Sequence, residues 1–262
     1  LAGCGYSEAY TWSLARDDPH PDALRLPVPL SAEHAVLRTT LVEGLVDAAR
    51  ANVDAGNEAI ALFEVARVYL PRGEDLPEER WRLGAIAQGG YFRVKGAVET
   101  LHEALGIEPE FERTSEPFLH PGRAARVAAG WVGELHPSLL EGRWGIFELD
   151  LATLFAGVPE RVEYEDVVTY PAVRQDLAFV VADEVAAGDL VRAAREAAGP
   201  ELREARVFDV YRGGQVPAGH KSVAIRVAFQ SSERTLSDED ARALRGAIVA
   251  ALAERFGATL RG

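Results

Sequence analysis

Hydrophobic and polar residues alternate most regularly near the C-terminus of this chain. In the stretch 219–230, GHKSVAIRVAFQ, one side of a strand carries Val223, Ile225, Val227 and Phe229. The other side carries Ser, Ala, Arg, Ala and Gln at the even positions. Strict alternation is typical of a half-buried strand. The first side is expected to join a hydrophobic core, and the second side raises the question of what it contacts.

The pattern around this strand predicts a complete small domain. Strands are expected at 177–181, 202–211 and 221–230, with a short final strand at 258–261. Helices are expected at 187–198, where Gly-Pro follows, and from Ser237, where Asp240 completes a capping box. The order β-α-β-β-α-β is that of the split βαβ, or ferredoxin-like, arrangement. Both helices then cover one face of an antiparallel sheet, and the Ser/Ala/Arg/Ala/Gln side of 222–230 lies on the other, open face.

The preceding part of the chain predicts a mixed domain of helices and strands. Helices are expected at 35–50 and 94–105, and strands at 59–69, 81–88, 126–132 and 144–151. A polar stretch with two prolines, 158–170, separates this part from the next. The sequence therefore predicts an α+β chain of two domains, residues 1–160 and residues 166–262.

Composition agrees with ordinary globular domains and limits the location. The chain has 262 residues, of which 48% are hydrophobic and 26% charged, and its single cysteine, Cys4, rules out an internal disulfide. No apolar run approaches the ~18 residues that span a membrane, and no signal peptide is recognisable. We expect a cytoplasmic protein without a membrane partner. The chain contains no methionine, even at position 1, so we interpret it as the C-terminal piece of a larger protein.

The negative charge is concentrated in the first domain. Residues 166–262 contain 13 Lys and Arg against 14 Asp and Glu, so only −1 of the total charge of −13 falls there. The acidic first part repels nucleic acid on average. The nearly neutral, arginine-rich second part is the better candidate for an RNA contact.

Catalytic and metal-binding motifs are not recognisable in the sequence. There is no phosphate-binding loop and no Gly-x-Ser-x-Gly elbow, and the six histidines do not fall in a metal-ligand spacing. Glu148 and Asp150 flank Leu149 and share one face of a strand, where a structural or interface role is favoured over acid–base chemistry. We expect no catalytic residue, metal or cofactor in this chain.

Several stretches together resemble the C-terminal region of the β subunit of bacterial phenylalanyl-tRNA synthetases. Their order and spacing make chance unlikely, and the longest one, at 208–240, is the most specific. The stretches are GYSEAYTWSL, PLSAEHAVLRTTLVEGLV, LFEVARVYLP, HPGRAARV, VGELHP, FELDL, YPAVRQDLAFVV and FDVYRGGQVPAGHKSVAIRVAFQSSERTLSDED.

For the first domain, the resemblance implies a catalytic-like but inactive class II synthetase fold that packs against the catalytic α subunit. A working class II site needs arginines in its second and third motifs to hold ATP phosphates. Arg67 could be the remnant of the first, but the third motif's place offers Glu148 and Asp150, which would repel phosphates. ATP and Mg²⁺ are therefore expected for the full enzyme and not for this chain.

For the second domain, the resemblance implies a ferredoxin-fold anticodon-binding domain that binds tRNA(Phe) and no DNA. Small residues on an open sheet face let RNA approach, and Arg, Gln and Ser can pair with phosphates or read bases. The candidate contacts are Arg174, Gln175, His220, Lys221, Ser222, Arg226, Gln230 and Arg234. Arg174 and Arg234 could instead form salt bridges with Asp176, Asp209 or Glu233.

Three other interpretations stay open at this point. A ferredoxin-like domain can be an amino-acid sensor, and Gly213, Gly214 and Gly219 permit a ligand-binding loop. The first domain could be an active class II-like ligase, such as a relative of biotin-protein ligases, which would bind ATP. Both domains could also be purely structural, with protein contacts and no RNA contact.

Overall fold

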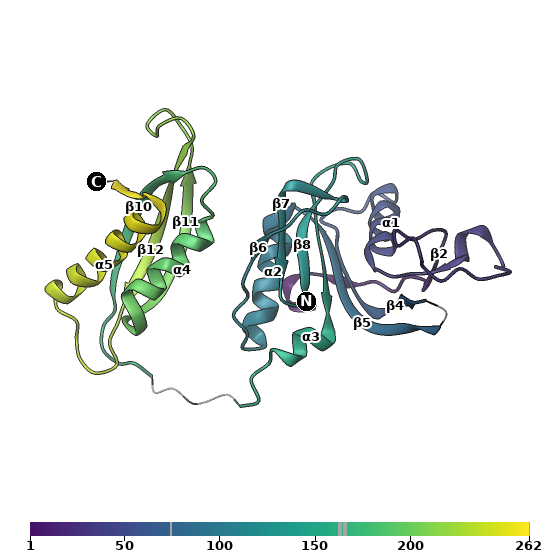
Figure 1. Cartoon of the computed structure of the whole chain (residues 1–262), viewed down its shortest axis with the longest axis horizontal. Helices are drawn as coiled ribbons and strands as arrows, with labels where there is room; N and C mark the ends of the chain where they lie inside the picture. The colour runs from purple at the N-terminus through teal and green to yellow at the C-terminus, as the bar shows by residue number, and fades with distance from the viewer. Residues whose placement is uncertain (74, 162–163, 165–166, 262) are drawn as a thin grey trace. The chain divides into compact units, whose positions relative to one another are not determined.

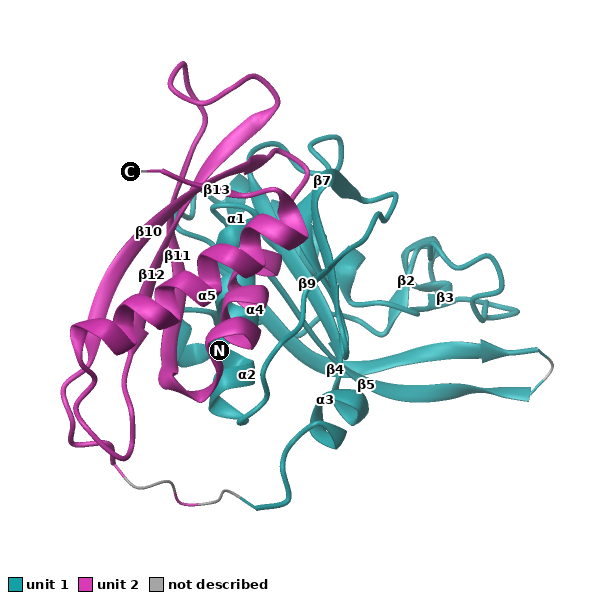
Figure 2. Ribbon diagram, turned by 60° about the vertical axis from the view of Figure 1, so that its left-hand side comes forward, with its two compact units in different colours: residues 1–162 teal, residues 163–262 magenta. Residues whose placement is uncertain are grey.

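The computed structural model describes residues 1–73, 75–161, 164 and 167–261, which form two compact units (Figures 1 and 2). The first unit comprises residues 1–162 and the second unit residues 163–262. Within the described ranges, no helix combines the length and the apolar character needed to cross a membrane.

The first unit is built on one long sheet with the strand order β1-β4-β5-β9-β8-β7-β6. Strand β1 runs parallel to β4, and the other neighbours are antiparallel. The strands are β1 (Ser7–Glu8), β4 (Ala61–Arg72), β5 (Asp75–Gln88), β6 (Glu112–Arg113), β7 (Leu119–Val127), β8 (Gly130–Leu135) and β9 (Trp144–Asp150). A small separate sheet pairs β2 (Leu14–Ala15) with β3 (Val36–Leu37), and short 3-10 turns lie at η1 (Ala2–Cys4) and η2 (Ala32–His34).

Helices cover both faces of this long sheet. Helix α1 (Val42–Asp54) packs on one face with Ile146 of β9, and helix α2 (Tyr91–Ala104) packs on the other with Phe147. Short helix α3 (Leu151–Ala156) contributes Leu154 to the α2 side. Because successive side chains of a strand point to opposite faces, β9 supplies both cores, and all of its residues are buried.

Several sequence-based boundaries in the first unit are wrong; strand β5, for example, begins at Asp75 and not at position 81. The helix expected at 35–50 begins only at Val42, because Val36 and Leu37 pair with β2 as an extended strand. The single strand expected at 126–132 is two strands, which a turn at 128–129 separates. A side chain at Gly130 would place Cβ 2.1 Å from the backbone oxygen of Glu148, so glycine is required where this turn meets the central strand.

The second unit has the predicted β-α-β-β-α-β order. It comprises β10 (Val173–Ala182), α4 (Ala187–Ala198), β11 (Leu202–Tyr211), β12 (His220–Phe229), α5 (Asp238–Phe256) and β13 (Thr259–Arg261), with a 3-10 turn η3 (Gly199–Glu201) after α4. The sheet order is β11-β12-β10-β13, and every neighbouring pair is antiparallel. Both helices lie on one side of the sheet (Figure 2). The fold class α+β and the ferredoxin-like topology are therefore confirmed.

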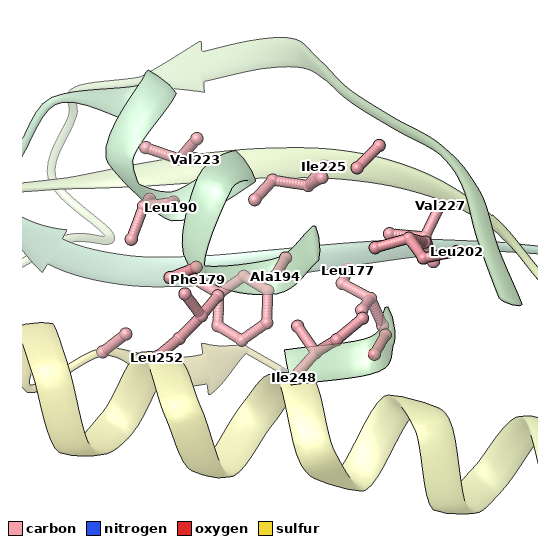
Figure 3. Packing of buried hydrophobic residues seen from close by; sticks show 14 of the residues in the cluster. Leu177, Phe179, Leu190, Ala194, Leu202, Val223, Ile225, Val227, Ile248 and Leu252 are labelled. Atoms are coloured by element: carbon pink, nitrogen blue, oxygen red, sulfur yellow. The ribbon is translucent and has the colours of Figure 1, made fainter. Parts of the chain in front are cut away.

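The core of the second unit lies between the sheet and its two helices. Phe179 of β10 and Ile225 of β12 meet Leu190 of α4 and Ile248 and Leu252 of α5, as Figure 3 shows. The odd positions of 222–230 are buried there, as the alternation predicts. Helix α5 begins at the predicted capping box, in which the Ser237 hydroxyl accepts from the Asp240 N–H and the Asp240 carboxylate accepts from the Ser237 N–H.

Candidate nucleic-acid interface

The face of the second unit's sheet that is turned away from α4 and α5 is called the open face here. Residues that pair directly across antiparallel strands share a face. The register therefore places Arg206, Arg226 and Asp176 in one row across β11, β12 and β10. The full set of paired positions on the open face is Arg174, Asp176, Ala178, Val180, Ala182, Glu204, Arg206, Asp209, Tyr211, His220, Ser222, Ala224, Arg226, Ala228, Thr259 and Arg261.

Arg226 lies at the centre of this face with its guanidinium held by two contacts. Its Nε and Nη2 atoms each donate to a different carboxylate oxygen of Asp176, at 2.8 Å. Its guanidinium carbon lies 4.9 Å from the ring centroid of Phe208. The hydrogen bonds from Arg226 lower the pKa of the Asp176 carboxyl, and Asp176 raises the pKa of Arg226. The positive charge of Arg226 is thus compensated within the sheet.

Arg206 and Arg174 differ from Arg226 in that their guanidinium groups are not held by neighbouring side chains of the described residues. Both side chains are exposed, and neither has a hydrogen-bond or ion-pair partner among the described residues. Arg206 lies directly opposite Arg226 on the edge strand β11. The expectation that Arg174 could pair with Asp176 is not met, because Asp176 is engaged by Arg226. Both arginines can therefore reach a phosphate.

Two aromatic residues beside the arginines were missed in the sequence. Phe208 and Tyr211 of β11 are 45% and 40% exposed, so part of each ring is accessible. The register shift between Val207 and Asp209 makes Phe208 the extra residue of a β-bulge, so its ring reaches Arg226 on the open face. Tyr211 lies opposite Ser222. The stretch FDVY was quoted for the resemblance, but the alternation within it is broken by the bulge, which the sequence does not reveal.

Gln175 and Lys221 do not lie on the open face, and this corrects the candidate set. Gln175 lies two positions before Leu177 and therefore on the same side of β10. It faces helix α5, where it lines a shallow pocket with Arg242 and Arg245. Lys221 has the phase of Val223 and is only 5% exposed, and its Nζ donates to the carbonyl of Asp183. Both residues were selected by chemical type, whereas the period of two in these strands decides which side each one takes.

The remaining candidates are distributed around the rim or are covered. Ser222 lies on the open face but is buried, at 5% exposure. His220 is exposed beside the β11–β12 turn. Gln230 donates to the carbonyl of Tyr170 at 2.6 Å and so ties down the segment before β10. Arg234 forms a bidentate pair with Asp240 of the capping box and not with Asp209 or Glu233.

The acidic residues singled out in the first unit have structural roles. Glu148 is buried and accepts from the Thr40 hydroxyl and the Leu41 N–H, both at 2.7 Å. Burial raises its pKa. Asp150 accepts from the Thr153 N–H and thereby caps helix α3.

Arg67 is also occupied, because it pairs with Glu79 at 2.7 Å and lies over the Trp81 ring. Among the described residues, no group of three or more His, Cys, Asp or Glu side chains is arranged to hold a metal ion.

A ferredoxin-like sheet whose open face carries arginines and aromatic rings is the architecture of an RNA-binding domain class. Residues 168–261 match the model of the ferredoxin-fold anticodon binding domain, and residues 1–151 match that of the phenylalanyl tRNA synthetase beta chain CLM domain. The chain therefore belongs to the phenylalanyl tRNA synthetase beta chain family.

Individual relatives agree with this assignment. The phenylalanine–tRNA ligase beta subunits of Geobacillus kaustophilus and Symbiobacterium thermophilum are 34% and 35% identical over 100% of this chain. The alignments cover 37% and 33% of those proteins, so the chain spans about a third of the length of the curated relatives that it matches. Among solved structures, the pyrrolysyl tRNA synthetase PylSc of Desulfitobacterium hafniense is similar over 59% of this chain and 62% of that one, with 18% identity and a TM-score of 0.47.

Proposed function

We propose that this chain is the C-terminal part of the beta subunit of a phenylalanine–tRNA ligase and that its second unit binds tRNA(Phe) near the anticodon. The observation that carries the proposal is the match of residues 168–261 to an anticodon-binding domain whose open face presents exposed rings beside two arginines that have no ion-pair partner among the described residues. Arg206 and Arg174 supply attraction to phosphates, and Phe208 and Tyr211 supply planes on which unpaired bases stack.

The electrostatics of the chain favour the second unit as the RNA contact. Residues 166–262 are nearly neutral overall, whereas the acidic excess lies in the first part of the chain. A local arginine surface can attract RNA only where the surrounding field does not repel it. The sensor interpretation has less support, since the pocket of the second unit lies beside Gln175 and Arg242 and is not lined by Gly213, Gly214 or Gly219.

The test is the binding of the 262-residue chain to fluorescently labelled tRNA(Phe), followed by fluorescence anisotropy at several salt concentrations. A tRNA with a changed anticodon is the control. We expect binding that weakens with salt and prefers the matching anticodon, and Tyr211→Ala is expected to reduce that preference. No binding to either tRNA, even at low salt, would refute the proposal. A response to free phenylalanine in its place would favour the sensor interpretation.

We further infer that the first unit contacts the alpha subunit and does no chemistry itself. Its residues do not fit ATP: buried Glu148 and Asp150 lie where phosphate-binding cations would be needed, and Arg67 is already paired. Large apolar side chains between β1 and β3 are nevertheless fully open, among them Tyr10 and Leu30. Such exposure is a sign of a protein interface. In the proposed enzyme, ATP and Mg²⁺ act on the alpha subunit.

Co-purification tests this second role. A tagged alpha subunit is expected to retain the wild-type chain and to lose Leu30→Asp, while Leu76→Asp, an equally exposed leucine in the β4–β5 hairpin, serves as the matched control. Equal retention of both variants would place the interface elsewhere and contradict this inference.

A further inference from the structure

The way in which Arg226 contacts RNA follows from the side chains that already hold it. An arginine can pair with a phosphate through its N–H groups or stack its plane on a base. At Arg226, Nε and Nη2 donate to Asp176, and the guanidinium carbon lies over the Phe208 ring at 4.9 Å from its centroid. The Nε/Nη2 edge of the guanidinium is therefore occupied by a carboxylate, so only the N–H groups of Nη1 and the second N–H of Nη2 remain for a phosphate.

The charge around Arg226 also disfavours a phosphate. Asp176 neutralises the guanidinium, and Glu204 of the neighbouring strand adds a second negative charge close by. A phosphate would have to displace or approach these carboxylates. Arg206, directly opposite on β11, is exposed and has no such partner among the described residues, so it is the better phosphate ligand in this row.

We propose that Arg226 is a preorganised stacking platform for an RNA base: Asp176 and Phe208 hold its guanidinium plane in place, and Arg206 beside it supplies the phosphate contact. This inference rests on the proposed RNA binding and adds the mode of contact. The Arg226 side chain is 40% exposed, so part of the guanidinium remains accessible to a base. Asp176 is then a positioning residue, since it fixes the plane without touching the RNA.

The arrangement has an energetic rationale. An arginine held in one orientation loses less side-chain entropy when a base stacks on it than a mobile arginine does. A neutralised arginine also attracts distant phosphates less, so it does not compete for contacts that carry no sequence information. The row thus separates two tasks, attraction at Arg206 and base contact at Arg226.

Four variants separate stacking from phosphate pairing, with tRNA(Phe) anisotropy measured across a salt series. Arg226→Ala and Arg226→Lys are both expected to weaken binding about 5- to 100-fold, because lysine keeps the charge and loses the plane. Arg226→Lys is not expected to change the slope of log Kd against log salt, because the positive charge is kept. Arg206→Ala is expected to reduce the magnitude of that slope by about 0.7, as the loss of one phosphate contact to a single strand requires.

Asp176→Asn is expected to change the affinity for RNA in opposite directions, depending on whether Arg226 stacks on a base or pairs with a phosphate. If Arg226 stacks, the variant frees the guanidinium from its fixed plane and weakens binding. If Arg226 pairs with phosphate, the same variant unmasks a positive charge, so binding tightens and the salt slope steepens. Circular dichroism and thermal melting of each variant verify that the second unit is folded.

Tighter binding by Asp176→Asn, or wild-type affinity of Arg226→Lys, would overturn the stacking inference while leaving RNA binding intact. A wild-type chain that binds no RNA at low salt would overturn both this inference and the proposed function. Weakening by Arg226→Ala, Arg226→Lys and Asp176→Asn, with an unchanged slope for Arg226→Lys, is the supporting result.

Discussion

The buried ion pair of the first unit offers the sharpest stability prediction, through Arg38→Met. The Arg38 guanidinium is 5% exposed and donates to Glu64 at 3.1 Å, to the Thr11 hydroxyl at 2.8 Å and to the Arg67 carbonyl at 3.1 Å. Glu64, at 1% exposure, also accepts from the Thr11 N–H. The pair therefore joins the segment at Thr11 and the segment before α1 to strand β4.

Methionine is close to arginine in length, so Arg38→Met is not expected to leave a cavity. The loss of stability is expected to come from the buried Glu64 carboxylate, which then has no arginine to compensate it. Removing one partner of a buried pair costs about 3–5 kcal/mol, because the other charge stays buried without compensation. For a domain of this size, each 1 kcal/mol lowers the melting temperature by roughly 2–4 °C. The double variant Arg38→Met with Glu64→Leu removes both charges and should recover at least about 2 kcal/mol of the loss.

Urea denaturation followed by tryptophan fluorescence measures this effect in the correct unit. All four tryptophans, at positions 12, 81, 131 and 144, belong to the first unit. The matched control is Arg16→Met, which breaks an ion pair with Glu33 whose side chains are 75% and 58% exposed and should change stability by less than about 0.5 kcal/mol. A loss below about 1 kcal/mol for Arg38→Met, or a double variant less stable than the single one, would refute the reasoning.

Three further predictions follow from single contacts. Burial raises the pKa of Glu148 above its ordinary 4.5, so the folded chain holds the proton more tightly than the unfolded chain, and the free energy of unfolding falls as the pH rises through the raised pKa. The urea midpoint between pH 4 and pH 8 should therefore fall less in Glu148→Gln than in the wild type. An equal fall in both proteins contradicts this prediction. Gly145→Ala would place Cβ 2.4 Å from the Gly90 oxygen, so thermal melting is expected to show a stability loss of at least about 1–3 kcal/mol. The control Gly96→Ala lies in open space within α2 and should leave stability unchanged or raise it. Equal melting points for the two variants contradict this prediction. Ser237→Ala removes the α5 cap and should cost about 1 kcal/mol, measured by circular dichroism; no change would mean that the cap is replaced by solvent.

Parts of the candidate site were accessible to sequence reasoning. The alternation in 222–230 correctly assigns Val223 and Ile225 to the core, and it places Arg226 on the open face. The same phase argument, applied to Gln175 and Lys221, would have placed them on the helix side. Their side-chain chemistry suits RNA, but their odd positions place them on the buried side of the strands.

The sequence by itself determined the local features of this protein. The capping box at Ser237, the helix stop at Gly199 and the period-two strands are all encoded in neighbouring residues, and they are sufficient for the β-α-β-β-α-β order. Such signals depend on contacts within a few positions, which is why they are readable without coordinates.

Only the tertiary structure decided which charges of the open face are available. Asp176 reaches Arg226 across 50 positions, and the β11 bulge delivers Phe208 to the same guanidinium. Strand register depends on the packing of whole side-chain faces and on bulges, and no local pattern specifies it. Arg226 and Arg206 are the same residue type and lie opposite each other in the sheet. Arg226 is neutralised by Asp176, whereas Arg206 has no ion-pair partner among the described residues, and this difference exists only in the folded sheet.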